Sequence, residues 1–168
     1  TLASNYYEIN STDLIRLVAG MLDQLIAVND RIPFERDHLT RFHSRTAPNI
    51  SVVDYLTRIV RYTRLENSCL LLILVYIDWA PGTMPVFHIS SLTVHRFLIT
   101  AVTISAKAIC DYYCTNTHYA RVGGVSIQEM NSLEIELLNY LRWRVTAPFE
   151  VLQQYYMSLV ARHPEYQL

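Results

Sequence analysis

The chain has 168 residues, and at this length about 70% of the unfolded surface is buried on folding, so we expect one domain with its own core. Hydrophobic residues make up 51% of the chain and charged residues 17%, a balance that argues against a disordered protein. The formal net charge is −1, whereas general nucleic-acid-binding proteins carry a basic excess for phosphate contacts. The three cysteines show no metal-ligand spacing and are typical of reduced, mostly buried thiols in an intracellular protein.

The first half of the chain predicts two helices separated by a polar connector. Residues 1–10 form an irregular lead-in, and a helix with a continuous apolar face follows over about residues 11–29. The connector after it is polar and contains two prolines. Over residues 50–65, apolar side chains recur at helical spacing and predict the second helix.

The middle of the chain contains its most apolar segment. A helix that begins near residue 67 is apolar on every side over residues 69–77, which places it at the centre of a domain. This run is far shorter than the ~20 residues that cross a bilayer. Prolines and a glycine within residues 78–88 predict a turn, and a long helix follows over about residues 90–112.

The helix after the next connector has a strong start signal. The connector, residues 115–125, predicts one helical turn. Ser126 then caps a helix that runs to about residue 143, because its hydroxyl can accept a hydrogen bond from a first-turn amide, and Glu129 can reach back to the Ser126 amide. A last helix begins at Pro148, where the missing amide costs nothing. We therefore predict an all-α fold.

Two charged side chains lie beside the apolar faces of these helices. Lys107 borders the apolar stripe of the helix over residues 90–112, and Glu134 lies beside the buried face of the helix that starts at Ser126. By themselves these residues favour two ordinary surface charges, since lysine and glutamate are mostly exposed in folded proteins.

Several short motifs in this helical order are similar to a known family. They are VYID at residues 75–78, LTVHR at residues 92–96 and NTHYARVGGVS at residues 116–126. With SAK at residues 105–107 and LE on the helix after Ser126, the chain resembles a cyclin box over residues 30–160. It is most similar to the Pho-type cyclins, also called P/U-type, for which YARVGG is a specific signal.

The resemblance implies an architecture. A cyclin box is a five-helix bundle, here around the central apolar helix, and we expect an additional N-terminal helix and a C-terminal helix. On this basis the lead-in and first helix occupy residues 1–33 and the connector residues 34–49. A single cyclin box would then occupy residues 50–146, and the C-terminal helix residues 147–168.

The resemblance also implies a function. Cyclins are regulatory subunits of cyclin-dependent protein kinases and have neither catalysis nor a cofactor of their own. The family's conserved lysine and glutamate match Lys107 and Glu134. In cyclins these residues bond the backbone around the kinase C-helix and hold it where activity requires it. We therefore interpret both residues as kinase-binding. Further side chains expected at this contact are Ile104, Asp111, Met130 and Leu138. We expect a heterodimer with the kinase in the cytoplasm and/or nucleus, without membrane or nucleic acid, in cell-cycle control or phosphate signalling.

Two other functions stay open. A cyclin-fold adaptor would bind protein or nucleic acid without activating a kinase, but the near-zero net charge and the retained Lys107 and Glu134 count against it. A small helical enzyme would need paired carboxylates, a metal set or an activated nucleophile, and none of these is recognisable. His38 and His43 lie in the connector without a metal-binding pattern.

The chain departs from the family at three places. Trp79 stands where an arginine commonly follows YID, and Cys110 stands where an acidic residue is common. Residues 50–58 do not reproduce the apolar substrate-docking motif of cell-cycle cyclins. We therefore expect no substrate recruitment through that part of the first box helix.

Overall fold

The computed structural model describes residues 1–80 and 87–168, and in these residues the regular structure is helical, without a strand. The all-α prediction is thus confirmed. Part of the turn predicted within residues 78–88 lies outside the described residues. The helices are α1 (Ser11–Asn29), the short 3₁₀ helix η1 (Arg36–His38), α2 (Val52–Thr63), α3 (Asn67–Trp79), α4 (Val94–Ile109), α5 (Asn116–Gly123), α6 (Ile127–Tyr140) and α7 (Phe149–Arg162).

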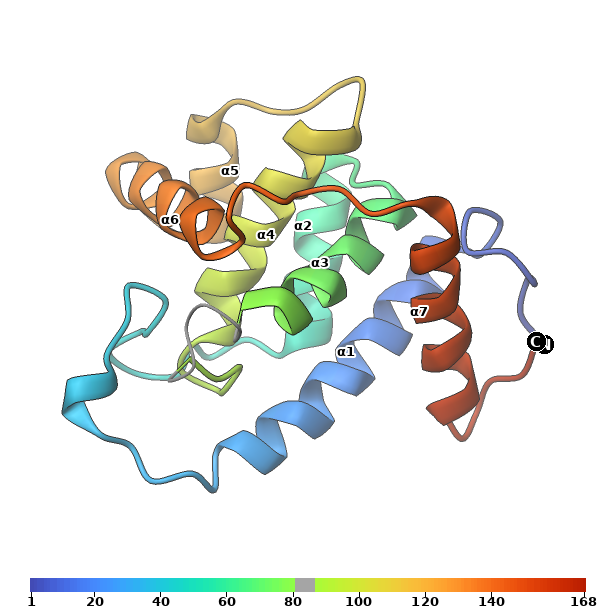
Figure 1. Cartoon of the computed structure of the whole chain (residues 1–168), viewed down its shortest axis with the longest axis horizontal. Coiled ribbons are helices and arrows are strands. Elements are labelled where there is room, and N and C mark those ends of the chain that lie inside the picture. Colours follow the sequence, from blue (N-terminus) through green and yellow to red (C-terminus); the bar gives the residue numbers. More distant parts are fainter. Residues whose placement is uncertain (81–86) are drawn as a thin grey trace.

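The apolar helix α3 lies at the centre of the bundle, as predicted. All eight residues 69–76 are buried, and the helix packs against α1, α4 and α7 (Figure 1). It shares this central place with α4, which packs against α2, α3, α5 and α6 and is buried over residues 97–106. Each fully buried aliphatic side chain contributes roughly 1.5–3 kcal/mol, so these two helices are a large source of core stability, and the other helices pack their apolar faces around them.

The helices α1 and α7 complete the domain on one side. The helix α1 packs against α2, α3 and α7, and α7 packs against α3. The two chain ends lie side by side (Figure 1), where the Leu2 amide donates to the Gln167 carbonyl oxygen at 2.6 Å. The lead-in is also fixed, because the Asn67 side chain donates to the carbonyl oxygens of Tyr6 and Ile9 at 3.0 and 2.9 Å.

The limits of α4 differ from the prediction of residues 90–112. Its start is delayed to Val94 because the Thr93 hydroxyl accepts from the Ser90 amide at 2.8 Å and donates to the His88 carbonyl oxygen at 2.7 Å. These bonds hold a turn in place of a first helical turn. The helix ends at Ile109, so the residues after it form a loop.

The connector before α6 contains more helix than predicted. The segment Asn116–Gly123 is a two-turn helix, α5, in place of a single turn. Gly124 follows with φ of 77°, a left-handed conformation that favours glycine at a helix C-terminus. Gly123 has a different role, because a Cβ there would lie 2.9 Å from the Cβ of Ile99. Gly123 thus permits close packing of α5 on α4, and Gly124 permits the left-handed backbone conformation that ends α5.

Neither a membrane-spanning helix nor a cluster of metal ligands occurs in the part of the chain that the structure describes. In residues 1–80 and 87–168, no helix is both long and apolar enough to cross a bilayer. The same residues contain no group of three or more histidine, cysteine or acidic side chains placed to hold a metal ion.

Candidate functional site

Lys107 and Glu134 form an ion pair across the contact between α4 and α6. The Lys107 Nζ lies 2.8 Å from Oε1 of Glu134 and 3.1 Å from Oε2. The lysine side chain is 32% exposed and the glutamate side chain 13% exposed, so the pair lies at the surface but is partly desolvated. Lys107 is in the last turn of α4, where the helix dipole favours a cation. The two residues singled out from the sequence are therefore adjacent.

A third residue, Asn116, holds the glutamate in place and was missed by the sequence analysis. Its side-chain amide donates to Oε2 of Glu134 at 2.8 Å and to the Asn131 side-chain oxygen at 2.7 Å. The Asn116 Oδ1 atom is buried without a hydrogen-bond partner among the described residues. The Glu134 carboxylate is thus fixed from α4 and α5, and one acceptor beside it is unused. The only hint in the sequence was that Asn116 opens the NTHYARVGG motif.

Local sequence chemistry places these three helices. The Ser126 hydroxyl accepts from the Glu129 amide at 3.1 Å, which confirms the predicted cap of α6. The Thr115 hydroxyl caps α5 by accepting from the His118 amide at 3.2 Å. The close approach of Gly123 to Ile99 then sets the distance of α5 from α4. Asn116 consequently reaches α6 from the first turn of α5.

The carboxylate of Glu129 has another partner than the one expected. In place of the Ser126 amide it pairs with Arg96 of α4 and, at 3.8 Å, with Arg41 of the connector. Arg41 also lies 3.0 Å from Oε2 of Glu136, and the Arg96 Nε donates to the Arg41 carbonyl oxygen at 2.8 Å. These four side chains join the connector, α4 and α6 at a second point along the α4–α6 contact.

Exposed apolar side chains lie close in the sequence to the residues of the ion pair. Tyr112 and Tyr113, in the loop between α4 and α5, are 94% and 58% exposed. Ile135, next to Glu134 on α6, is 54% exposed, and Leu138 is half-buried. Large exposed apolar residues are the kind of side chain from which protein interfaces take most of their affinity.

Three of the predicted contact residues differ in exposure, and their role at a kinase contact stays a prediction. Ile104 is 3% exposed and Met130 is fully buried, where its sulfur accepts from the Thr103 hydroxyl at 3.8 Å. Both side chains belong to the α4–α6 core and offer no surface to a partner in this structure. Asp111 was expected to continue α4, but it lies in the loop beyond the end of the helix, with an exposed side chain.

The departures from the family pattern also have structural counterparts. The Arg144 guanidinium lies 3.8 Å from the centre of the Trp79 ring, so an arginine from elsewhere in the chain stacks on the residue after YID. The Cys110 sulfur lies 3.3 Å from that of Cys69, and both thiols are free. Burial raises the pKa of both thiols, which keeps them protonated.

His95 of the VHR motif is a packing residue. It is 7% exposed, and its ring lies edge-on against Tyr55 with 4.9 Å between centroids. The ring Nε2 is 2.9 Å from the Ile50 carbonyl oxygen, to which it donates. Burial lowers the pKa of His95 despite this bond, so the ring is neutral near pH 7.

Comparisons with known proteins agree with this architecture. The cyclin family model matches residues 12–145. The chain is 48% identical over 157 residues to the Nuc-1 negative regulatory protein preg of Neurospora crassa, covering 92% of this chain and 32% of the relative. It is 40% identical over 148 residues to the PHO85 cyclin PHO80 of Saccharomyces cerevisiae, covering 86% of this chain and 50% of the relative.

A plant relative matches over more of its own length. Cyclin-U1-1 of Arabidopsis thaliana is 37% identical over 150 residues, which cover 87% of this chain and 71% of the relative. The chain thus spans a third to a half of the two fungal relatives and most of the plant one. The matched region includes the helices that carry Lys107, Asn116 and Glu134. The chain therefore belongs to the cyclin family, among the Pho-type (P/U-type) cyclins.

Proposed function

We propose that this chain is the regulatory subunit of a cyclin-dependent protein kinase, which it activates by holding the kinase C-helix in its active position. The observation that carries the proposal is the Lys107–Glu134 pair at the surface between α4 and α6. The yeast relative PHO80 is a PHO85 cyclin, which supports a protein partner for this surface. The chain would act without catalysis of its own, in the cytoplasm and/or nucleus, in a heterodimer with the kinase.

The pair suits this task because it presents both signs of charge at one point. The lysine ammonium can donate to a backbone carbonyl of the kinase, and the glutamate carboxylate can accept from a backbone amide. Hydrogen bonds to ionised groups are about twice as strong as those between neutral groups, and they fix the register of an apolar contact. Removing one such partner typically costs about 2–5 kcal/mol of binding.

In the free chain, the side chains of Lys107 and Glu134 are already restrained to a narrow range of conformations. Lys107 and Glu134 restrain each other, and Asn116 restrains Glu134 from α5. Little further side-chain entropy is therefore lost on binding, which would otherwise cost about 0.5–1.5 kcal/mol for each long side chain. Asn116 is in this sense a positioning residue for the proposed contact.

Activation would follow from a shift in the kinase population. A kinase alone samples positions of its C-helix, and a partner that binds one position more tightly increases its population. In that position the kinase's own lysine–glutamate pair can close over the nucleotide phosphates. The exposed Tyr112, Tyr113 and Ile135 would supply the apolar part of the contact that stabilises this state.

The proposal is tested by recovering the partner. The tagged chain is incubated with a lysate of its own source, and the bound proteins are identified by mass spectrometry and assayed for protein kinase activity. We expect a cyclin-dependent kinase whose activity depends on the chain. If the folded chain recovers no kinase, the adaptor function replaces the one proposed here.

A further inference from the structure

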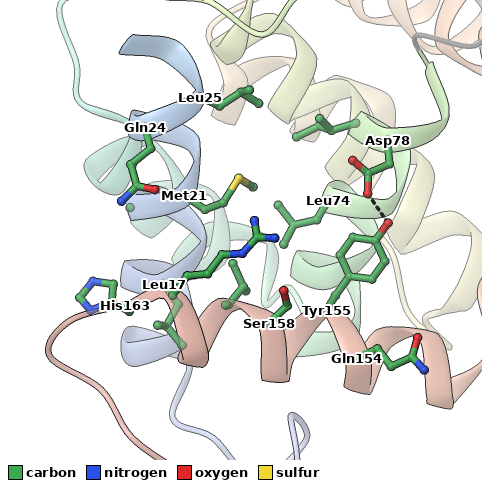
Figure 2. Close-up of a pocket in the computed structure, with 14 residues that line it drawn as sticks. Leu17, Met21, Gln24, Leu25, Leu74, Asp78, Gln154, Tyr155, Ser158 and His163 are labelled. Carbon is green, nitrogen blue, oxygen red and sulfur yellow. Dashed lines mark hydrogen bonds between the residues drawn. The ribbon is translucent and has the colours of Figure 1, made fainter. Parts of the chain in front are cut away.

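A cavity of about 470 Å³ lies between α1, α3 and α7, within the size range of binding pockets. Figure 2 shows Met21 and Leu25 of α1 facing Leu74 of α3 across this space, with α7 as the third wall. We call it the α1–α7 groove. The residues that make its floor are all aliphatic or methionine: Leu17, Met21, Leu25, Leu74, Ile77 and Leu159.

The floor leaves apolar side chains uncovered. Leu17, Leu74 and Leu159 are buried, but Met21 and Leu25 are only partly buried at the groove. Apolar surface that is concave and edged by polar groups is typical of a binding site. The groove therefore fits an occupant with an apolar face.

The edges of the groove are polar and carry one acidic residue and one arginine, of which only the acidic residue has a hydrogen-bond partner in the described part of the chain. At one end, the Asp78 carboxylate accepts a hydrogen bond from the Tyr155 hydroxyl, shown in Figure 2, so it already has a partner. At the other end, Arg162 is exposed and has no hydrogen bond or ion pair with any residue that the structure describes. The Nδ1 atom of the neighbouring His163 accepts a hydrogen bond from the Glu165 amide at 3.2 Å. Asp78 keeps its negative charge, but Arg162 is the charged lining residue without a partner among the described residues, and its guanidinium can pair with an anionic group on the occupant.

The length of the groove indicates what kind of occupant fits. Tyr155 and Arg162 are seven residues apart on α7, which is about 10 Å at 1.5 Å per residue. Leu17 and Leu25 are eight residues apart on α1, or about 12 Å. Two helical turns match the spacing with which an amphipathic helix inserts anchors at i, i+4 and i+7 into a groove.

We propose that the α1–α7 groove binds an amphipathic helical segment of another protein, with aliphatic anchors at that spacing and an acidic side chain that pairs with Arg162. Gln24 on the α1 edge and Ser158 on the α7 edge are exposed and can bond a peptide along both sides, which an amphiphile with a single polar head would not use. This inference does not depend on kinase activation.

The groove is separate from the proposed kinase contact. Figure 1 shows α6, which carries Glu134, and α7, which lines the groove, on opposite sides of the bundle. A kinase on the α4–α6 surface would leave the groove open. The chain would in this way bring a second protein to the kinase it binds.

The test uses a displayed library of short random peptides selected against the free chain. We expect enriched peptides with the helical apolar spacing and an aspartate or glutamate. Ser158→Trp, which fills the groove from an exposed position, should weaken their binding about tenfold or more, or ~1.4 kcal/mol. The matched control is Met157→Trp, a neighbouring exposed position that does not line the groove, and it should leave binding unchanged. Arg162→Glu should shift selection toward basic peptides.

Three outcomes would overturn the inference. Enriched peptides that bind the Ser158→Trp variant as tightly as they bind the wild-type chain would have a binding site outside the α1–α7 groove. No enrichment, together with saturable binding of dodecanoate that Ser158→Trp abolishes, would make this a site for a small amphiphile. Dimerisation of the wild-type chain in sedimentation, lost in Ser158→Trp, would make the groove an interface between copies. Because none of these uses a kinase, failure here leaves the proposed function untouched.

Discussion

Replacing Gly123 with alanine tests how closely α5 must approach α4. The added Cβ would lie 2.9 Å from the Cβ of Ile99 and closer still to its Cγ1, whereas carbon atoms in contact are about 3.5–4.0 Å apart. Ile99 is fully buried, and the Gly123 carbonyl oxygen accepts from the Tyr55 hydroxyl at 2.7 Å, so neither side can move freely. Overpacking costs about 1–3 kcal/mol, and replacing a helical glycine returns about 0.5–1 kcal/mol. Because neither side can yield, the overpacking cost should lie in the upper part of its range, about 2–3 kcal/mol, and we expect a net loss of about 1–2.5 kcal/mol in the free energy of unfolding.

Urea unfolding followed by circular dichroism measures this loss in a double-mutant cycle. In an Ile99→Ala background the nearest clashing atom is gone, so Gly123→Ala should cost about 1 kcal/mol less than in wild type. Gly124→Ala is the control, because its cost of about 1–2 kcal/mol arises from the left-handed backbone and should be the same in both backgrounds. A Gly123→Ala protein as stable as wild type, or a cost that Ile99→Ala does not change, would refute the reasoning.

Three further predictions concern single residues. Burial lowers the pKa of His95, so the unfolded chain binds a proton more readily than the folded chain does. The free energy of unfolding should therefore fall as the pH drops below about 6.5, and it should fall less in His95→Gln. Melting temperatures measured across this pH range check the prediction. Burial raises the pKa of the Cys69 thiol, and iodoacetamide reacts with the thiolate, so it should modify half-buried Cys114 before Cys69. Equal modification rates of the two cysteines, measured by mass spectrometry, would contradict this. Asn116→Ala should weaken kinase binding about threefold to tenfold in calorimetry, and Asn131→Ala, which spares the Glu134 bond, should weaken it less.

The features that could be predicted from the sequence are those that depend on near neighbours. The Ser126 cap involves an amide three residues away, and the apolar run at residues 69–76 needs no partner to mark a buried helix. The start of α4 could not be predicted, because Thr93 competes with the first helical turn through bonds to Ser90 and His88 that depend on the loop's path.

The site itself depends on contacts between distant parts of the chain. Lys107 and Glu134 are 27 residues apart, and their direct pairing follows from the packing of α4 on α6. Their assignment as kinase-binding residues came from the family resemblance, and their spacing in the sequence did not indicate that they pair. Met130 shares the helical stripe of Leu133 and Leu137, so periodicity already placed it in the core, where the structure has it. Asn116 could not be assigned, since its partners lie on another helix.

The most direct measurement of the central claim uses a charge swap, Lys107→Glu together with Glu134→Lys. Each single reversal places like charges about 3 Å apart and should lower stability by about 1–3 kcal/mol. The double variant restores the internal pair, and the Asn116 amide can turn its unpartnered oxygen toward the new lysine.

The swapped chain should therefore melt near the wild-type temperature, while it presents each charge to the wrong backbone group of the kinase. Kinase binding is measured by calorimetry with the wild-type and swapped chains. We predict a loss of about 30-fold or more, corresponding to ~2 kcal/mol. A swapped chain that is folded and binds the kinase as tightly as wild type would contradict the role assigned to Lys107 and Glu134.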